Sequence, residues 1–202
     1  MSKKLLLIAA TQHEILPYLQ QTHHHDVLIT GVGIASTTFR LTRKLAHHHY
    51  DLVLQAGVAG AFAASFAKMG AVLQINKDAF GDLGSYEQGK LYDLNELELS
   101  HEPLWFPTAE YETGLPVAKG VTVQTLTNNA DLLQAIQQKW NADTESMEGA
   151  AAAYVCYEKK VPFLQIRAVS NIVGERNKAN WQLNSAISNL NEVLKALVPR
   201  FY

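Results

Sequence analysis

Glu148 is the acidic residue with the most distinctive surroundings in this sequence. It lies in the run Met147-Glu148-Gly149, which is followed by four alanines, so the helix predicted here has almost no polar face. Such a helix must be buried, and its N-terminus favours the ionised form of a carboxylate. A carboxylate can accept two hydrogen bonds from neighbouring hydroxyls such as those of a ribose. We therefore predict a sugar-binding acid, with simple capping of the helix as the alternative.

Glu14 is the second acid in a favourable place, because it follows the apolar run Leu5–Ala10 closely. Ligands of open α/β sheets bind beyond the carboxyl ends of the strands. A carboxylate at that edge can hold a water molecule and deprotonate it. An amphipathic helix also often carries a glutamate in its first turn, so this alternative stays open.

Two further segments follow predicted strands. Gly57, Val58 and Ala59 come after the strand Asp51–Ala56, and a glycine-rich turn there would bring backbone N–H groups close to a ligand. The segment matches neither a Walker A nor a G-x-G-x-x-G pattern, so a tight turn without a ligand is equally compatible. Ser170 and Asn171 follow the predicted strand Pro162–Val169 and add polar groups to the same edge.

The two histidine triplets, His23–His25 and His47–His49, are not interpreted as metal sites. We expect both at the ends of helices, where consecutive side chains point in different directions and paired ligands usually need i, i+4 spacing. Helix C-termini favour cationic side chains, so solvated helix ends are predicted. The one cysteine, Cys156, is expected in the core. No metal and no other cofactor is expected.

The elements that would position these residues are short apolar runs that alternate with amphipathic stretches. The predicted strands are Lys4–Ala10, Asp26–Thr30, Asp51–Ala56, Ala71–Ile75, Val121–Gln124 and Pro162–Val169. The predicted helices begin at Gln12 and span Ile34–Leu45, Ala130–Trp140, Met147–Lys159 and Leu183–Leu197. A long loop, of the kind that often binds ligands, is predicted over 91–116.

This alternation predicts an α/β fold with a mixed, largely parallel central sheet and helices on both faces. The whole length, residues 1–202, is expected to form one domain. The formal charge of −2 comes from interspersed acids and bases, which argues against a nucleic-acid partner. The N-terminal apolar run is too short for a signal peptide, and no run approaches the ~20 residues that cross a membrane. We expect a cytoplasmic protein without a membrane partner.

The segment from Glu145 to Asn171, ESMEGAAAAYVCYEKKVPFLQIRAVSN, resembles the methylthioadenosine/S-adenosylhomocysteine nucleosidases of the nucleoside phosphorylase superfamily. The shared features are Met-Glu followed by small residues, a Val-Pro-Phe strand and a terminal Arg-small-apolar-Ser. The resemblance covers nearly the whole chain. It implies that Glu148 binds the ribose hydroxyls, that Met147 packs on the sugar and that Glu14 activates water.

Position 171 departs from that pattern, because those nucleosidases have an aspartate there that protonates N7 of adenine, whereas this chain has Asn171. An amide donates a hydrogen bond but delivers no proton. Related phosphorylases that are specific for 6-oxopurines use asparagine in this place. The resemblance therefore implies that the leaving base is hypoxanthine rather than adenine.

The segment Ser170–Arg176, followed by Trp181, is similar to the S-N-x-V-x-x-R…W signature of futalosine hydrolases, and the stretch FGDLG at 80–84 is similar to their D-L-G segment. Those enzymes release hypoxanthine from futalosine on a route to menaquinone. We hypothesise that Arg176 or a neighbouring base meets the benzoate carboxylate of that substrate, since a guanidinium matches a carboxylate. A structural salt bridge from Arg176 to Glu175 or another acid is the alternative.

Three other functions compete with a futalosine hydrolase. A phosphorylase would need an arginine- and glycine-rich phosphate site near Gln12 and His13, which is not evident. A methylthioadenosine nucleosidase is disfavoured by Asn171, and a nucleoside-binding module without catalysis is disfavoured by the presence of both glutamates. By resemblance we expect a small-molecule nucleoside substrate and a homodimer or higher homo-oligomer, in which a neighbouring subunit completes the 91–116 loop.

Overall fold

The fold is organised around two long strands, β3 (Leu52–Ala61) and β10 (Phe163–Ile172), which pair in parallel along their whole length. The computed structural model describes residues 3–201. β1 (Leu5–Ala9) adds to the other edge of β3 and β2 (Asp26–Ile29) adds to β1, both in parallel. The apolar, buried residues of β1, β3 and β10 are typical of strands that are covered on both sides, whereas β2 at the edge is half-buried.

On its other side β10 pairs antiparallel with β4 (Val72–Phe80), which pairs in parallel with β8 (Val117–Thr122). β9 (Thr144–Ser146) then joins β8 back to the end of β3. The strands β3, β10, β4, β8 and β9 therefore form a closed ring of pairings, so the sheet is curled at this end. β7 (Phe106–Pro107) pairs with β4, and β5 (Ser85–Glu87) and β6 (Lys90–Tyr92) form a separate hairpin.

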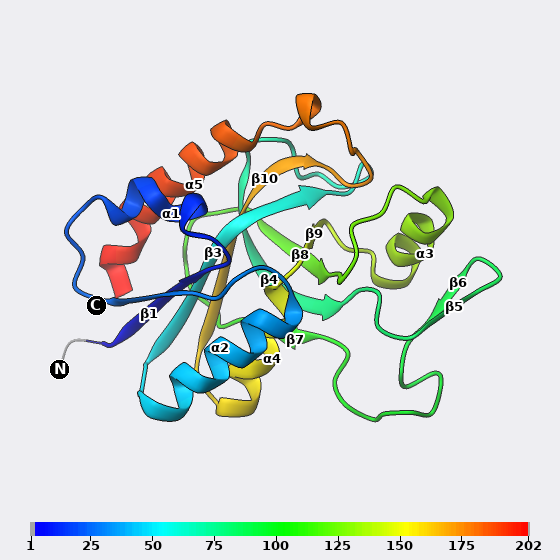
Figure 1. The fold of residues 1–202 in the computed structure, drawn as a ribbon, viewed down its shortest axis with the longest axis horizontal. Helices are drawn as coiled ribbons and strands as arrows, with labels where there is room; N and C mark the ends of the chain where they lie inside the picture. The colour runs from blue at the N-terminus through cyan, green and yellow to red at the C-terminus, as the bar shows by residue number, and fades with distance from the viewer. Residues whose placement is uncertain (1–2, 202) are drawn as a thin grey trace.

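Helices lie on both sides of the open part of the sheet (Figure 1). α1 (Gln12–Leu19) and α5 (Leu183–Leu197) cover one side, and α2 (Ile34–His47) and α4 (Gly149–Lys159) cover the other. α3 (Ala130–Trp140) packs near the β5–β6 hairpin. Two short 3-10 turns, η1 (Lys178–Asn180) and η2 (Val198–Phe201), flank α5. The predicted α/β class, with its mixed sheet between helices, is confirmed.

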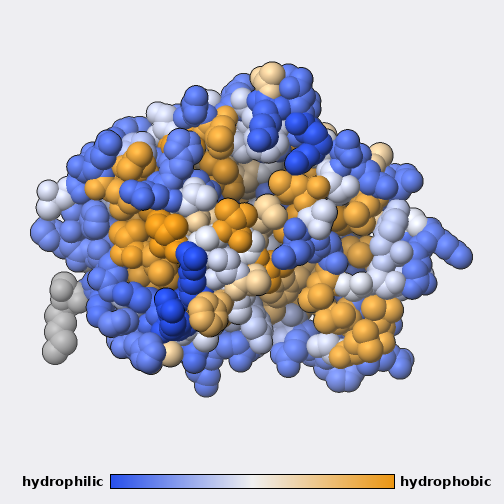
Figure 2. All heavy atoms as spheres, viewed as in Figure 1, coloured by the Kyte–Doolittle hydropathy of each residue, from blue (hydrophilic) through white to orange (hydrophobic). Residues whose placement is uncertain are grey.

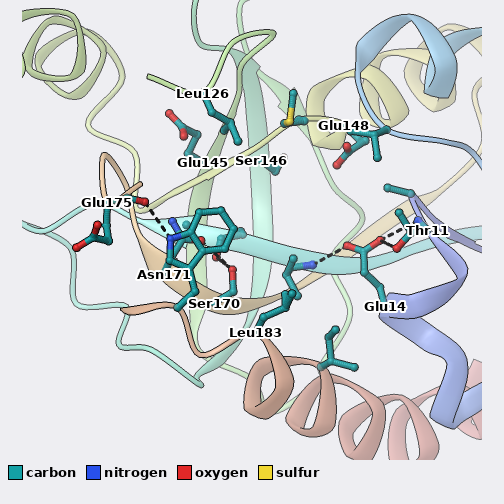
Figure 3. Close-up of a pocket in the computed structure, with 18 of the residues that line it drawn as sticks. Thr11, Glu14, Leu126, Glu145, Ser146, Glu148, Ser170, Asn171, Glu175 and Leu183 are labelled. Atoms are coloured by element: carbon teal, nitrogen blue, oxygen red, sulfur yellow. Dashed lines mark hydrogen bonds between the residues drawn. The ribbon is translucent and has the colours of Figure 1, made fainter. Parts of the chain in front are cut away.

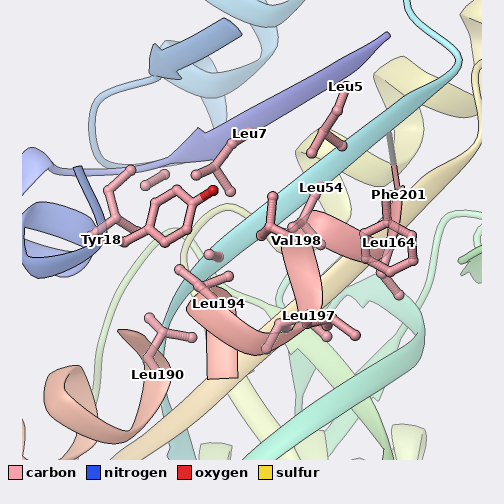
Figure 4. Close-up of a cluster of buried hydrophobic side chains, with 14 of the residues drawn as sticks. Leu5, Leu7, Tyr18, Leu54, Leu164, Leu190, Leu194, Leu197, Val198 and Phe201 are labelled. Atoms are coloured by element: carbon pink, nitrogen blue, oxygen red, sulfur yellow. The ribbon is translucent and has the colours of Figure 1, made fainter. Parts of the chain in front are cut away.

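The largest core cluster fixes α5 on the sheet (Figure 4). Leu190, Leu194 and Leu197 of α5 pack on Leu54 of β3 and Leu164 of β10, and all of these side chains are buried. At about 1.5–3 kcal/mol for each fully buried large aliphatic side chain, this cluster is a major source of stability. A second cluster joins α2 and α4 to the opposite side and contains Cys156, as expected from the sequence.

Several predicted boundaries are wrong in an informative way. Gly57–Ala61 was expected to be a turn, but it is the second half of β3, held by pairing with β10 and β9. Ser170 and Asn171 lie inside β10, at a register irregularity, rather than after the strand. β4 continues past Ile75, where the predicted strand ends. β8 begins at Val117, before the predicted start at Val121. The 91–116 segment contains the end of β6 and the strand β7.

The first histidine triplet does not end a helix. α1 stops at Leu19, and the rings of His23 and His25 stack beside Tyr18, with the His25 and Tyr18 ring centroids 5.7 Å apart. Burial is the main cause that lowers the pKa of His25 to about 4. The expectation of a solvated helix end is therefore wrong here. It is confirmed for His47–His49, which are exposed at the end of α2.

The surface carries apolar side chains in several separate areas (Figure 2). Val32 and Phe39, near and on α2, are 56% and 65% exposed. Exposed apolar area of this kind is typical of interaction surfaces, and the expected homo-oligomer stays a prediction. Within residues 3–201, no helix has both the length and the apolar character needed to span a bilayer.

Candidate active site

A cavity of about 290 Å³ opens where β1, β3, β9 and β10 end (Figure 3). The sequence analysis named three catalytic residues, and all three, Glu14, Glu148 and Asn171, line it. The predicted substrate-binding residues on its wall are Val58, Ala59, Met147, Ser170 and Arg176. Gly57 is not among the lining residues. The labelled side chains divide into two ends, with Glu14 and Glu148 at one and Asn171 and Glu145 at the other.

Glu14 is held in place by three hydrogen bonds. The N-cap residue of α1, Thr11, donates its backbone N–H (2.9 Å) and its hydroxyl (3.0 Å) to Oε2. The backbone N–H of Val58 donates to Oε1 at 3.1 Å. The side chain is 7% exposed. Because a carboxylate has about four lone-pair positions, Glu14 can still accept a hydrogen bond from a water molecule in the cavity.

Gly57 supports this arrangement from behind. A Cβ atom at this position would lie 2.9 Å from Oε1 of Glu14 and 2.6 Å from Nη1 of Arg167. Both distances are shorter than side chains tolerate, so any larger residue would displace these two groups. Gly57 was predicted to contact the ligand. In the structure, its lack of a side chain leaves space for Glu14 and Arg167 beside the cavity.

Glu148 is the N-cap residue of α4 rather than a member of its first turn. Its Oε1 accepts a hydrogen bond from the backbone N–H of Gly33 at 3.1 Å, and its Oε2 lies 3.6 Å from Nη1 of Arg167. Burial raises the pKa of Glu148, while Arg167 and the Gly33 N–H act in the opposite direction. Desolvation exceeds these stabilising contacts, so the net shift of the pKa is opposite in direction to the effect expected from the helix end alone.

Arg167 is a residue that the sequence analysis missed. It is 1% exposed in the middle of β10, and its Nη1 also donates to the carbonyl of Val58 at 3.3 Å. Its Nε and Nη2 have no hydrogen-bond partner among residues 3–201. An arginine within the apolar run Phe163–Val169 was the available signal, since a buried charge needs a partner. Here that partner is Glu148.

At the other end, Asn171 has its amide oriented by its neighbours. Oδ1 accepts a hydrogen bond from the hydroxyl of Ser170 at 2.8 Å, and Nδ2 donates to the carbonyl of Ile172 at 3.0 Å. Oγ of Ser170 also lies 3.3 Å from the carbonyl oxygen of Ala59, which can share the same hydroxyl proton. One N–H of the Asn171 amide is left to donate to a ligand.

Glu145 is the second residue that the sequence analysis missed. It precedes the recognised Ser-Met-Glu motif, lies on β9 and lines the same cavity. Its side chain is 6% exposed, and its Oε2 has no hydrogen-bond partner in the described part of the chain. Burial, followed by repulsion from Asp82, raises the pKa of Glu145 to about 7, and the positive charge of Arg176 opposes this.

Arg176 lies at the rim on this side, with its guanidinium 6.0 Å from the ring centroid of Trp181. Trp181 is itself fixed by a hydrogen bond from Nε1 to the carbonyl of Glu175 at 3.0 Å. The carboxylate oxygens of Glu175 accept hydrogen bonds from the backbone N–H of Asn177 and the side-chain amide of Asn180, both at 2.6 Å. No ion pair of Arg176 occurs within residues 3–201, so the salt bridge considered as an alternative is not formed.

The cavity wall is therefore polar at both ends and apolar between them. One end offers two buried carboxylates with fixed orientation, and the other offers an amide donor and a carboxyl group that binds its proton near neutral pH. In residues 3–201 no cluster of three or more histidine, cysteine or acidic side chains has the arrangement of a metal site.

The chain matches known proteins over most of its length. Residues 18–199 match the family model described as the phosphorylase superfamily. A futalosine hydrolase from Streptomyces coelicolor is 32% identical over 186 residues, which cover 86% of this chain and 78% of that protein. A futalosine hydrolase from Thermus thermophilus is 29% identical over 180 residues, which cover 85% and 80%.

Solved structures with this fold include a 5'-methylthioadenosine/S-adenosylhomocysteine nucleosidase from Colwellia psychrerythraea in complex with adenine. The TM-score is 0.81 at 19% identity, and the alignment covers 100% of this chain and 96% of that one. At this identity the likeness bears on the fold.

Proposed function

We propose that this chain, which belongs to the phosphorylase superfamily, hydrolyses the N-glycosidic bond of futalosine and releases hypoxanthine. Its class of activity is that of an N-glycosidase, in line with relatives named futalosine hydrolase and methylthioadenosine/S-adenosylhomocysteine nucleosidase. The observation that carries the proposal is the meeting of Glu14, Glu148 and Asn171 around one cavity.

Glu14 has the position of the general base. Its carboxylate is fixed by Thr11 and Val58 and faces the cavity with lone pairs to spare. A water molecule held there would lose a proton to Glu14 as its oxygen attacks C1′ of the sugar. Because the donors belong to the cap residue Thr11 and to the backbone of β3, the carboxylate needs no reorganisation during the reaction.

Glu148 has the position of the ribose-binding acid. The transition state of glycoside hydrolysis resembles an oxocarbenium ion, with positive charge on the sugar ring. The ionised carboxylate accepts hydrogen bonds from the ribose hydroxyls and opposes that charge, and Met147 packs on the sugar beside it. Arg167 and the Gly33 N–H keep Glu148 oriented and counter the effect of burial on its pKa.

Asn171 then lies at the base end, where its free N–H binds N7 or O6 of the purine. This favours a 6-oxopurine over adenine, because O6 accepts a hydrogen bond whereas the amino group of adenine donates one. The tail of futalosine leaves from the ribose, so it extends away from Asn171. Arg176 is on the Asn171 side of the cavity, which makes it a contact for the base rim more readily than for the benzoate. His13, which lines the cavity beside Glu14, is the basic side chain nearer to the ribose end.

The main alternative is a methylthioadenosine/S-adenosylhomocysteine nucleosidase, because a relative of that name from Tolumonas auensis is 27% identical over 191 residues. A phosphorylase is less favoured, since among the described residues that line the cavity the arginine is Arg176, on the Asn171 side and away from His13 and Glu14. A nucleoside-binding module without catalysis is disfavoured by the fixed orientation of both carboxylates.

Product chromatography tests these possibilities together. The protein is incubated with futalosine, inosine or methylthioadenosine, each with and without phosphate, and the released bases and sugars are identified. We expect hypoxanthine from futalosine at a rate that phosphate does not change. Adenine from methylthioadenosine alone would overturn the choice of substrate, a ribose phosphate product would identify a phosphorylase, and no product from any nucleoside would leave only binding.

A further inference from the structure

Glu145 and Asn171 lie in one row across the sheet, on either side of Gly60. Gly60 is paired with Glu145 of β9 on one side and with Asn171 of β10 on the other. Residues that are directly paired on neighbouring strands project their side chains to the same face. Both side chains line the cavity, as does Gly60 itself, so the shared face is the one that meets the ligand.

The glycine leaves the floor between these two side chains bare. A Cβ atom at position 60 would lie 3.1 Å from Nδ2 of Asn171, so even an alanine would crowd the amide. Two strand spacings of about 4.8 Å separate the backbones of residues 145 and 171. That width accommodates a purine placed over Gly60 with polar groups of its edge directed to each side. Figure 3 shows the labelled Glu145 and Asn171 at the same end of the cavity.

Asn171 leaves one chemical requirement unmet. When the glycosidic bond breaks, its electron pair passes to the purine, which becomes a neutral product only by taking up a proton. The amide of Asn171 donates a hydrogen bond without delivering a proton. Glu145 is a buried carboxyl group on the same wall, and its Oε2 has no partner among the described residues.

We propose that Glu145 is the general acid for the departing base. As the C1′–N9 bond breaks, the carboxyl proton of Glu145 passes to N7 of the purine, while the N–H of Asn171 binds O6. The proton that Glu14 takes from water is released to solvent, and Glu145 takes up one proton after hypoxanthine leaves, so each turnover consumes only water. This role rests on the proposed function. It places the general acid on β9 rather than on β10, the strand that carries Asn171.

The electrostatic surroundings support a proton on Glu145. Burial is the largest cause of its raised pKa of about 7, Asp82 beyond the end of β4 adds to the effect, and Arg176 from the segment after β10 opposes it. The acid Glu175 also lines the cavity at this end. A general acid is most effective when its pKa is near the working pH. Its protonated fraction decreases as the pH rises through about 7.

The test is the pH dependence of kcat for the wild type, Glu145→Gln and Glu145→Asp, with whichever of the three nucleosides the wild type cleaves fastest. For the wild type we expect kcat to fall between pH 6 and pH 8. Glu145→Gln should lower kcat at pH 6 by about 100-fold or more and should lose the fall with pH. Glu145→Asp, which keeps an acid, should retain the fall. Glu192→Gln, on the exposed side of α5, is the matched control and should behave as the wild type.

Three results would overturn the role of Glu145. They are a wild-type kcat that does not fall between pH 6 and 8, a Glu145→Gln enzyme whose kcat at pH 6 stays within about threefold of the wild type, and a lowered kcat in that variant that keeps the same fall with pH. Thermal unfolding of each variant shows whether it is folded, and the wild-type profile decides the matter if Glu145→Gln is not. Failure of the proposed substrate would be visible in which nucleoside the wild type cleaves, whereas failure of this role would be visible in the pH profiles of the wild type and the variants.

Discussion

The two ends of the cavity are built differently. At the ribose end, Glu14 and Glu148 are held by backbone N–H groups, a cap hydroxyl and a buried arginine, all on elements of the sheet and its first helices. At the base end, Glu145 keeps an oxygen without a partner in the described residues, and Arg176 has no ion pair there. At the first end both carboxylates are held by several contacts, and at the second a buried carboxyl oxygen of Glu145 has no hydrogen-bond partner among the described residues.

This difference separates two tasks. A fixed end suits the steps that every nucleosidase of this kind shares, namely water activation and stabilisation of charge on the sugar, because preorganised groups act without rearrangement. An end with unsatisfied groups suits the choice of base, because a wrong base leaves buried polar atoms unpaired. We therefore expect changes at the ribose end to lower the rate for all substrates, and changes at the base end to alter preference and pH dependence.

Glu14→Gln should have the largest effect. The amide keeps the shape of the side chain but cannot accept a proton, so kcat should fall by about 10²–10⁴-fold with little change in KM. Steady-state kinetics with the preferred nucleoside measure this, with Glu158→Gln on the exposed face of α4 as control. An unchanged kcat would show that Glu14 is not the base.

Gly57→Ala should come next, and it tests whether the ribose end depends on fixed geometry. The new Cβ would approach Nη1 of Arg167 and Oε1 of Glu14, and a displacement of about 1 Å can lower a rate by about 100-fold. We expect a fall in kcat larger than the change in stability explains. Gly89→Ala, in the distant β5–β6 hairpin at φ +83°, is the control that strains the backbone without touching the cavity. Equal activity losses in the two variants would refute this explanation.

Asn171→Asp probes the base end. An acid on β10 can protonate N7 of adenine directly, so the ratio of kcat/KM for methylthioadenosine to that for futalosine should rise by about tenfold, which corresponds to about 1.4 kcal/mol. Competition between the two nucleosides in one reaction measures the ratio. Asn184→Asp, exposed in the first turn of α5, is the matched control. A ratio that stays constant would remove Asn171 from the choice of base.

The smallest of these effects should be a change in the free energy of unfolding of Glu145→Gln, which is separate from its expected loss of kcat. The pKa of Glu145 is about 7 in the folded protein, above its ordinary value of 4.5. Between these pH values the folded protein binds more protons than the unfolded chain, so the free energy of unfolding decreases as the pH rises through that window. The variant lacks this loss. Relative to the wild type it should gain about 1–3 kcal/mol on going from pH 5 to pH 8. Urea unfolding at both pH values tests this, and an equal difference at both would contradict it.

The order of strands predicted that Glu14 and Asn171 lie at one edge of the sheet, and the family resemblance added Glu148 to them. In the structure all three line one cavity. Periodicity failed where pairing decides the structure. Gly57–Ala61 has the small residues of a turn, yet neighbours on both sides hold it in β3. β4 continues through the polar residues Lys77 and Asp78 because β8 and β7 pair with them on either side, which no local pattern indicates.

Glu145 and Arg167 were missed for a related reason. Each lies next to a motif, and its burial depends on strands that are distant in sequence, as with Glu145 opposite Gly60. An arginine within an apolar strand was a visible signal for Arg167. No corresponding signal marked Glu145, because a glutamate before a helix is common on surfaces.

The rate at which Cys156 is alkylated can report how often α4 separates from the sheet. Cys156 is the chain's one cysteine, it is fully buried on the same helix that Glu148 caps, and burial raises the pKa of its thiol. Thiolate is the form that alkylating reagents attack, so labelling requires α4 to leave the sheet. The alkylation rate would then follow how often the ribose-binding wall comes apart, and a tight nucleoside analogue would slow it.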